Sequence, residues 1–117
     1  MRVISKKKIS DAMKTHPEVK EALFLWLKTF NVNSLRFESF AQVTECWRKV
    51  SAKNVDRIPC RHLAKTSQKG PLDIYVFDMN HYYRLICWVN SRNGYIYVKD
   101  ILSHAEYDKW CRKETSS

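Results

Sequence analysis

The sequence is poor in glycine and proline and has no long apolar run. Only two glycines and three prolines occur in 117 residues, so the chain lacks the Gly-rich and Pro-rich segments that form linkers. A membrane-spanning helix needs about eighteen or more consecutive apolar residues, and no such run is present. The N-terminus reaches Lys6-Lys7-Lys8 without an apolar stretch, which argues against a secretory signal. We therefore expect one cytoplasmic domain, residues 1–117, with no membrane partner.

Paired cysteines are also missing. Cys46, Cys60, Cys87 and Cys111 are scattered without a C-x-x-C pair, and structural zinc sites usually contain such pairs. The nearest approach to a zinc motif is Cys60-x-His62, whose spacing to the other cysteines matches no familiar site. We expect no metal and no cofactor.

Acidic residues are scarce relative to basic ones. The chain has 21 Lys and Arg against 12 Asp and Glu, which leaves a net charge of +9. Such an excess favours a polyanionic partner such as nucleic acid, or an acidic protein, and on charge alone a membrane surface stays open. Residues 48–69 contain seven basic residues and only one acidic residue, Asp56. Neutralising RNA phosphates is one reason for such a segment, and its candidate RNA contacts are Arg57, Arg61 and Lys65.

Hydrophobic periodicity predicts helices in the first half of the chain and strands in the second. Apolar residues between Pro17 and Phe30 recur at three- and four-residue spacing, which is typical of the buried stripe of a helix. Ser5 and Ser39 suit the N-caps of two further helices. This order of elements predicts an α+β domain with the N-terminal helices packed on one face of a small antiparallel sheet. The expected elements are a short strand or lead-in at 1–4, helices 5–13, 17–30 and 40–50, a possible strand 58–63, and strands 74–77, 82–90 and 95–102.

The dipeptide Asn93-Gly94 predicts that the last two strands form a hairpin. The loop contains either two residues (93–94) or four (91–94), and both choices sort the side chains onto the same two faces. One face is apolar and is expected to meet the helices, with Asp100 at its end. That face carries Leu85, Cys87, Val89, Ile96 and Val98.

The opposite face of the hairpin mixes cations with aromatic rings. A four-residue loop places Lys99 diagonal to Arg84, where both side chains reach a common ligand such as a phosphodiester. The alternative is that this face is the solvated side of a half-exposed sheet, covered by Tyr and Trp. The face consists of Tyr82, Arg84, Ile86, Trp88, Tyr95, Tyr97, Lys99 and Ile101.

Residues Ser103 to Glu106 form a capping box, so a short C-terminal helix is expected directly after the last strand. His104 is then the first helical residue, and Tyr107 lies one turn later on the same side. An imidazole at that place can transfer protons near neutral pH, and Tyr107 can orient it or bind a phosphate. A lone histidine at a helix start is more often inert unless other groups converge on it.

These residues resemble a known family. The chain has Tyr83-Arg84-Leu85-Ile86, then Val98-Lys99, then Ser103-His104-Ala105-Glu106-Tyr107-Asp108-Lys109. This series is similar to that of the HigB toxins of bacterial toxin–antitoxin systems, which belong to the RelE-like superfamily of mRNA interferases. The start at Val3 and the His16-Pro17 element, with Lys20 and Trp26, are also similar. The long basic middle segment and Asp78-Met79-Asn80-His81, where the family tends to have glycines, depart from its pattern.

The resemblance implies a RelE-like fold and metal-free cleavage of translated mRNA in the bacterial cytoplasm, with the 2′-OH attacking the adjacent phosphate to give a 2′,3′-cyclic phosphate. By the same resemblance, Arg84 and Lys99 stabilise the phosphate, His104 moves a proton and Tyr107 positions it, with Asp108 a further candidate to orient it. Partners would be mRNA, the ribosome and a cognate HigA-type antitoxin. The expected base-stacking residues are Trp88, Tyr95 and Tyr97.

Two other functions fit the same residues. A non-catalytic RNA- or ribosome-binding protein would use the basic and aromatic face for affinity alone. An inactive relative would serve as an interaction or regulatory protein. Cleavage of RNA and toxicity in cells distinguish the three functions.

Overall fold

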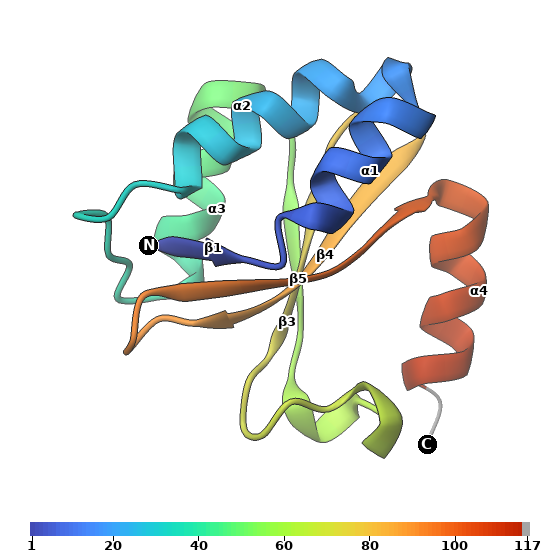
Figure 1. Ribbon diagram of the computed structural model, residues 1–117. Helices are drawn as coiled ribbons and strands as arrows, with labels where there is room; N and C mark the ends of the chain where they lie inside the picture. Colours follow the sequence, from blue (N-terminus) through green and yellow to red (C-terminus); the bar gives the residue numbers. More distant parts are fainter. Residues whose placement is uncertain (116–117) are drawn as a thin grey trace.

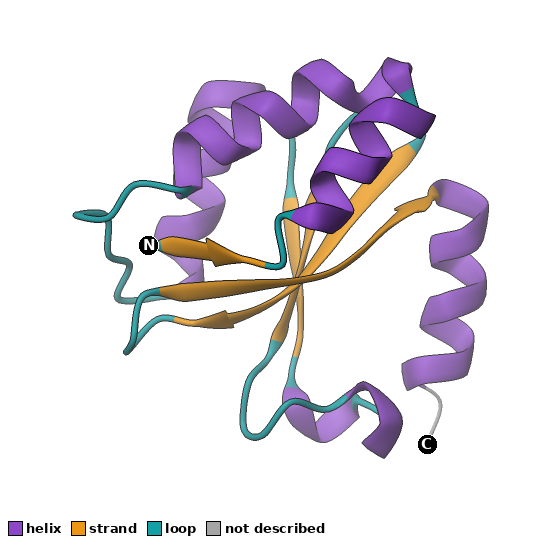
Figure 2. Cartoon of the chain, viewed as in Figure 1, coloured by secondary structure: helices purple, strands orange, loops and turns teal. Residues whose placement is uncertain are grey.

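The computed structural model describes residues 1–115, which form a five-stranded sheet with helices on both sides (Figures 1 and 2). The elements in chain order are β1 (Arg2–Ile4), α1 (Lys7–Thr15), the 3-10 helix η1 (Pro17–Val19), α2 (Lys20–Phe30), α3 (Phe40–Ser51), β2 (Val55–Ile58), the 3-10 helices η2 (Cys60–His62) and η3 (Lys65–Ser67), β3 (Ile74–Asp78), β4 (Tyr83–Asn90), β5 (Tyr95–Ser103) and α4 (His104–Thr115).

The strand order of the sheet is β1-β5-β4-β3-β2. Strands β2 to β5 pair in antiparallel fashion, as the sequence predicts, whereas β1 pairs with β5 in parallel. The sheet is therefore mixed. The prediction of a strand over 58–63 is wrong in position, because β2 ends at Ile58. Pro59 follows at once and has no N–H to donate to a sheet ladder.

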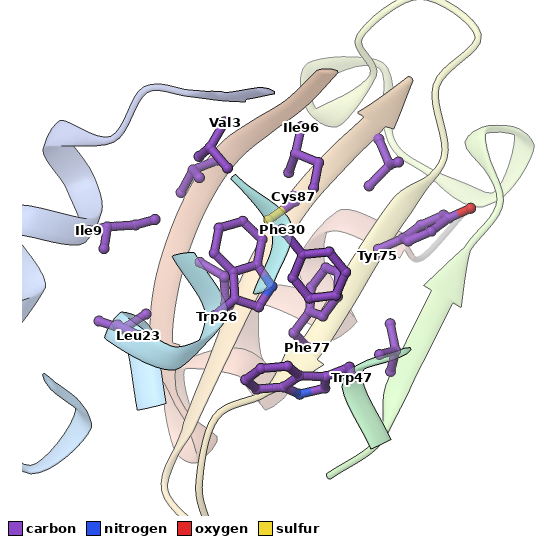
Figure 3. Close-up of a cluster of buried hydrophobic side chains, with 14 of the residues drawn as sticks. Val3, Ile9, Leu23, Trp26, Phe30, Trp47, Tyr75, Phe77, Cys87 and Ile96 are labelled. Atoms are coloured by element: carbon purple, nitrogen blue, oxygen red, sulfur yellow. The ribbon is translucent and has the colours of Figure 1, made fainter. Parts of the chain in front are cut away.

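Helices α1, α2 and α3 cover one face of the sheet, which confirms the predicted α+β arrangement (Figure 1). Their core is aromatic, as Figure 3 shows. The ring centroids of Trp26 and Phe30 lie 5.5 Å and 5.2 Å from that of Phe77 on β3, and all three side chains are fully buried. Trp47 of α3 joins them and donates its Nε1–H to the backbone oxygen of Asp78 at 2.9 Å. Burial of each such ring contributes about 1.5–3 kcal/mol.

The helix starts agree only in part with the sequence. Ser39 caps α3 as predicted, since its Oγ accepts from the backbone N–H of Gln42 at 3.3 Å. The prediction that Ser5 caps the first helix is wrong, because Ser5 has φ +67° and the helix begins at Lys7. The predicted helix 17–30 is divided into a 3-10 turn and α2, with the backbone of His16 (φ −131°, ψ 76°) separating it from α1.

The hairpin has the four-residue loop, since Asn90 pairs with Tyr95. A register shift follows further along: Cys87 pairs with Val98, but Ile86 pairs with Asp100. Lys99 is thus the extra residue of a β-bulge, and residues beyond a bulge exchange faces relative to the partner strand. The predicted faces therefore hold for 95–98 and are wrong beyond the bulge. Ile101 packs against the main core, whereas Leu102 packs on the opposite face.

The second face of the sheet is covered rather than open, which corrects the picture of a half-exposed sheet. The side chain of Ile86 is 0% exposed. Helix α4 lies over this face and contributes Tyr107 and Trp110, while the segment 60–67 contributes Leu63. Together they form a second, smaller core with Ile58, Ile74, Val76, Ile86, Trp88 and Leu102.

Candidate functional site

Arg84 lies near the start of β4, on the same face as the second core. Its Nε is 2.9 Å from Oδ1 of Asp78, the residue opposite it on β3. Its Nη1 donates to the backbone oxygens of Asn80 and Tyr83, each at 3.2 Å. Its Nη2 is 3.4 Å from Nδ1 of His104. With its side chain only 17% exposed, the guanidinium is fixed in place beside the imidazole.

The start of α4 is fixed to the start of β4. The backbone N–H of His104 donates to the oxygen of Tyr82 at 2.7 Å. The predicted capping box is confirmed, because Ser103 N–H donates to Glu106 Oε1 at 2.9 Å and Glu106 N–H donates to Ser103 Oγ at 3.2 Å. The backbone of His104, directly after β5, is therefore held beside the start of β4, which carries Arg84.

The two contacts of the His104 ring define its tautomer. A guanidinium group can only donate hydrogen bonds, so the Nδ1 atom that faces Arg84 is the acceptor. The proton of the neutral ring is then on Nε2, which is 3.5 Å from Oδ2 of Asp108. The side chain of His104 is 58% exposed and accessible to a ligand.

Asp78 forms an ion pair with Arg84, and burial makes the ionised form of its carboxyl less favourable. Burial raises the pKa of the Asp78 carboxyl, and the nearby Arg84 guanidinium opposes this rise. An arginine whose partner carboxylate is partly buried keeps a fixed orientation. Its Nη2 is thus preorganised to bind an anion that reaches His104.

Tyr107 lies in the second core, where its ring stacks on that of Trp110 with centroids 5.9 Å apart. Burial raises the pKa of the Tyr107 hydroxyl, and Cys111 adds to the rise. The predicted placement of Tyr107 one turn after His104 holds. Its ring, however, also attaches α4 to the sheet.

Contrary to the predicted phosphate clamp, Lys99 does not pair with Ile86, because Asp100 takes that position. As the bulge residue, Lys99 places its Nζ 5.0 Å from the centre of the Trp88 ring. Its backbone oxygen accepts from Nζ of Lys8 on α1 at 2.6 Å. The ammonium group of Lys99 is therefore directed to Trp88, whereas Arg84 contacts Asp78 and His104.

The far end of β4 carries the lysine–aromatic cluster, which we define as Trp88, Tyr95, Tyr97, Lys69 and Lys99. Lys69 Nζ is 4.8 Å from the ring centre of Tyr97 and 5.7 Å from that of Trp88. The rings of Tyr95 and Tyr97 are 6.1 Å apart. Trp88 donates its Nε1–H to the backbone oxygen of Ser67 at 3.0 Å, which attaches the basic segment to the sheet. Sequence reasoning missed Lys69, because only this packing brings it to the rings.

The three basic residues predicted to contact RNA are not together. Arg57 lies on the face of α3, with its guanidinium carbon 5.3 Å from the centre of the Phe40 ring, so it is separated from the cluster by the sheet. Arg61 and Lys65 are exposed in the segment that covers the second face.

A third group of polar residues lies where η1 meets the start of β4. The hydroxyl of Tyr83 donates to Oε1 of Glu18 at 2.5 Å and is 3.1 Å from Nδ1 of His16. This hydrogen bond lowers the pKa of Glu18 and raises that of Tyr83. No sequence signal marked Glu18 beyond its place at a helix start. A pocket of about 560 Å³ is lined by Glu18, Tyr82, Tyr83, Ser103, His104 and Ala105.

Among the described residues, no three His, Cys, Asp or Glu side chains are grouped so that they could hold a metal ion. Within residues 1–115, no helix has both the length and the apolar character that crossing a membrane requires.

Comparison with known proteins gives a family match within the second half of the chain. Residues 61–110 match the family model HigB_toxin, described as the RelE-like toxic component of a toxin–antitoxin system. The match supports a HigB-type toxin. It confirms the resemblance seen in the sequence, and the α+β fold with its short C-terminal helix is consistent with a RelE-like protein. No curated protein matches the chain.

For a HigB-type toxin, membership of a toxin–antitoxin system implies an antitoxin partner. The matched segment contains both ends of β4, from Arg84 to the lysine–aromatic cluster, and the start of α4. His16 and Glu18 lie outside it.

Proposed function

We propose that the protein is the toxin of a type II toxin–antitoxin system and acts as a metal-independent mRNA interferase that cleaves translated mRNA on the ribosome. The observation that carries this proposal is the arrangement of Arg84 and His104, whose nitrogens are 3.4 Å apart at the edge of an open pocket. A fixed guanidinium beside an exposed imidazole combines charge stabilisation with proton transfer. The family match to a toxic component supports the same function.

In the proposed reaction, the 2′-oxygen of one nucleotide attacks the adjacent phosphorus, and the bond from phosphorus to the 5′-oxygen breaks. Arg84 Nη2 stabilises the negative charge that develops on the phosphate oxygens. His104 moves a proton, and Tyr107 holds the first turn of α4 against the sheet. The products are a 2′,3′-cyclic phosphate and a free 5′-hydroxyl.

The lysine–aromatic cluster is the proposed binding surface for single-stranded RNA. Rings of tryptophan and tyrosine stack on bases, at about 1–3 kcal/mol per base, and lysines neutralise the phosphates between them. Lys99 therefore acts at Trp88, not at the reacting phosphate. Arg61 and Lys65 extend the basic surface, whereas Arg57 faces α3 and is left out of the proposed RNA path.

The proposed partners are translated mRNA, the ribosome and a cognate HigA-type antitoxin, all in the bacterial cytoplasm. An antitoxin that blocks the pocket beside His104 would stop cleavage directly. The net charge of +9 favours an acidic surface on such a partner.

The test is to express the gene with and without its neighbouring open reading frame and to map RNA ends. Expected are cuts at defined positions in translated frames, arrested growth, and suppression of both by the neighbour. Arg84→Ala and His104→Gln should abolish the cuts while circular dichroism stays unchanged. Matched controls are Arg92→Ala and His62→Gln, which alter exposed residues outside this group. Full activity of Arg84→Ala and His104→Gln would refute the assignment.

A non-catalytic RNA-binding protein is the second candidate function. The specific observation in its favour is the lysine–aromatic cluster, whose contacts do not involve His104. In that case the purified protein should retard RNA in a gel and leave it intact, and the cells should show no new RNA ends.

A further inference from the structure

We infer that Glu18 is the general base of this site and that Tyr83 and His16 position its carboxylate. The inference rests on the proposed function, because it adds a catalytic group to the same reaction. Glu18 and His104 line one pocket of about 560 Å³. Cleavage by a 2′-hydroxyl needs one group to accept a proton and another to donate one. A carboxylate and an imidazole in one pocket supply that pair.

Asn80 connects Glu18 to the rest of the site. Its Nδ2–H donates to the backbone oxygen of Glu18 at 3.2 Å, and its own backbone oxygen accepts from Arg84 Nη1 at 3.2 Å. Its Oδ1 accepts from the backbone N–H groups of Tyr82 and Tyr83 at 2.8 Å and 3.0 Å. The backbone at Glu18 is therefore attached to the strand start that carries Arg84 and anchors His104. Figure 1 shows this meeting of η1, β4 and α4 at one end of the sheet.

The hydrogen bonds at Glu18 keep its carboxylate ionised and oriented. The single proton of the Tyr83 hydroxyl goes to Oε1 of Glu18. Nδ1 of His16 must then donate to the Tyr83 oxygen, which defines the neutral tautomer of that ring. The same Nδ1 is 3.6 Å from Oε1. With its side chain 51% exposed, Glu18 keeps lone pairs available to a substrate hydroxyl.

The proton balance of the reaction then closes within the pocket. Glu18 takes the proton of the 2′-hydroxyl as the bond from the 2′-oxygen to phosphorus forms. As the bond from phosphorus to the 5′-oxygen breaks, that oxygen takes a proton from the His104 imidazolium. His104 takes up this second proton from solvent at Nδ1 before the cut, because the bound phosphate then accepts from both Arg84 Nη2 and the Nδ1–H. Asp108, 3.5 Å from Nε2, stabilises the imidazolium. Solvent afterwards returns both groups to their starting states.

The first test compares Glu18→Gln with Glu21→Gln. Glu21 is an exposed residue of the first turn of α2, so its variant removes the same charge a few residues away. On ribosomes carrying a short synthetic mRNA, Glu18→Gln should slow cleavage by about 100-fold or more, whereas Glu21→Gln should cleave at the wild-type rate. Both variants should keep the wild-type circular dichroism.

Tyr83→Phe tests positioning through the pH profile. Without the hydroxyl, the pKa of Glu18 should rise toward its ordinary value of 4.5, and the acidic limb of the rate profile should move up with it. The titratable groups around Glu18 are His16, Tyr82, Tyr83 and His104, and Glu106 on α4 interacts with both Tyr83 and His16. An unchanged profile in Tyr83→Phe would show that this hydroxyl does not position the base.

A sulfur leaving group separates the base from the acid. When sulfur replaces the 5′-oxygen at the cut, the leaving group is a thiolate. A thiolate leaves without a proton donor. The sulfur-containing mRNA should restore the rate of His104→Gln and leave Glu18→Gln slow. If the sulfur-containing mRNA restores the rate of Glu18→Gln, or if this variant cleaves ordinary mRNA at the wild-type rate, Glu18 is not the general base. The proposed function would be unaffected by either result. A wild-type chain that leaves translated mRNA intact would overturn the proposed function and this inference together.

Discussion

The ammonium group of Lys99 lies 5.0 Å from the centre of the Trp88 ring, four residues along β4 from Arg84. Four residues of a strand span about 13 Å. The β-bulge at Lys99 is the cause, because it removes this residue from the pairing with Ile86. A binding surface and a reactive pair thus occupy separate ends of one strand.

Loss of the two cluster lysines should weaken RNA binding without changing the chemical step. For single strands, each phosphate contact adds about 0.7 to the slope of log K against log salt. The Lys69→Ala/Lys99→Ala variant should therefore show a slope smaller by about 1.4, measured by fluorescence anisotropy on a short RNA. Its single-turnover rate at saturating RNA should equal that of the wild type.

Lys28→Ala is the matched control for charge. Lys28 is exposed on α2, across the sheet from the cluster. Lys28→Ala removes one charge where the double variant removes two. A slope smaller by about 0.7 in Lys28→Ala would therefore mean that the cluster contributes only general charge.

Tyr83→Phe should change how stability depends on pH. The Tyr83 hydrogen bond holds the folded pKa of Glu18 below 4.5. Stabilisation of this kind is complete above the unfolded pKa and is lost as the pH falls through the folded pKa. The stability difference between wild type and Tyr83→Phe should be constant from about pH 4.5 to about pH 10. It should shrink below this range as Glu18 is protonated and above it as Tyr83 ionises. Urea unfolding across this range measures it, and carboxyl NMR should show the pKa of Glu18 rising in the variant.

Trp110→Ala should loosen α4 while leaving the sheet intact. Trp110 and Tyr107 are the side chains of α4 that pack against the second core. Because Trp110 is only partly buried, the loss should be below the value of about 3 kcal/mol for a fully buried ring. Hydrogen exchange should accelerate in the amides of α4 and stay slow in β3 to β5. Lys109→Ala, an exposed neighbour, should leave both unchanged; faster exchange throughout the sheet would contradict a locally attached helix.

Gly94→Ala should destabilise the hairpin. Gly94 has φ +73°, and an added Cβ would lie 2.7 Å from Cζ of Arg36. The left-handed backbone alone costs about 1–2 kcal/mol for a residue with a Cβ. Gly70→Ala is the matched comparison, because Gly70 has φ +57° and open space around it. If the Arg36 contact adds to the cost, Gly94→Ala should lose more stability in urea than Gly70→Ala, and Arg36→Ala should remove the excess.

Features set by neighbouring residues could be predicted from the sequence. The Ser103–Glu106 capping box and the Asn93-Gly94 turn depend on a few adjacent side chains, and both are present as expected. The apolar stripe of α2 identified the core helix for the same reason. Local patterns thus define the elements and one face of the sheet.

Features set by distant contacts could not be predicted. No residue type marks Lys99 as a bulge, and periodicity does not show that α4 folds back over Ile86. Glu18 comes from a helix start in the first fifth of the chain, and only the packing of η1 against β4 brings it to the pocket of His104. The sequence therefore predicted that Lys99 shares a face with Trp88, but its predicted position opposite Ile86 is taken by Asp100.

The parallel pairing of β1 with β5 makes assembly depend on almost the whole chain. Arg2–Ile4 pair with Tyr95–Tyr97, so the first strand has no partner in the sheet until the hairpin has been synthesised. Contacts of such long sequence separation slow folding, because the chain must close a large loop before they form. His104 is made later still. During translation, β1 therefore stays unpaired until β5 has been made, and the reactive site stays incomplete until His104 has been added.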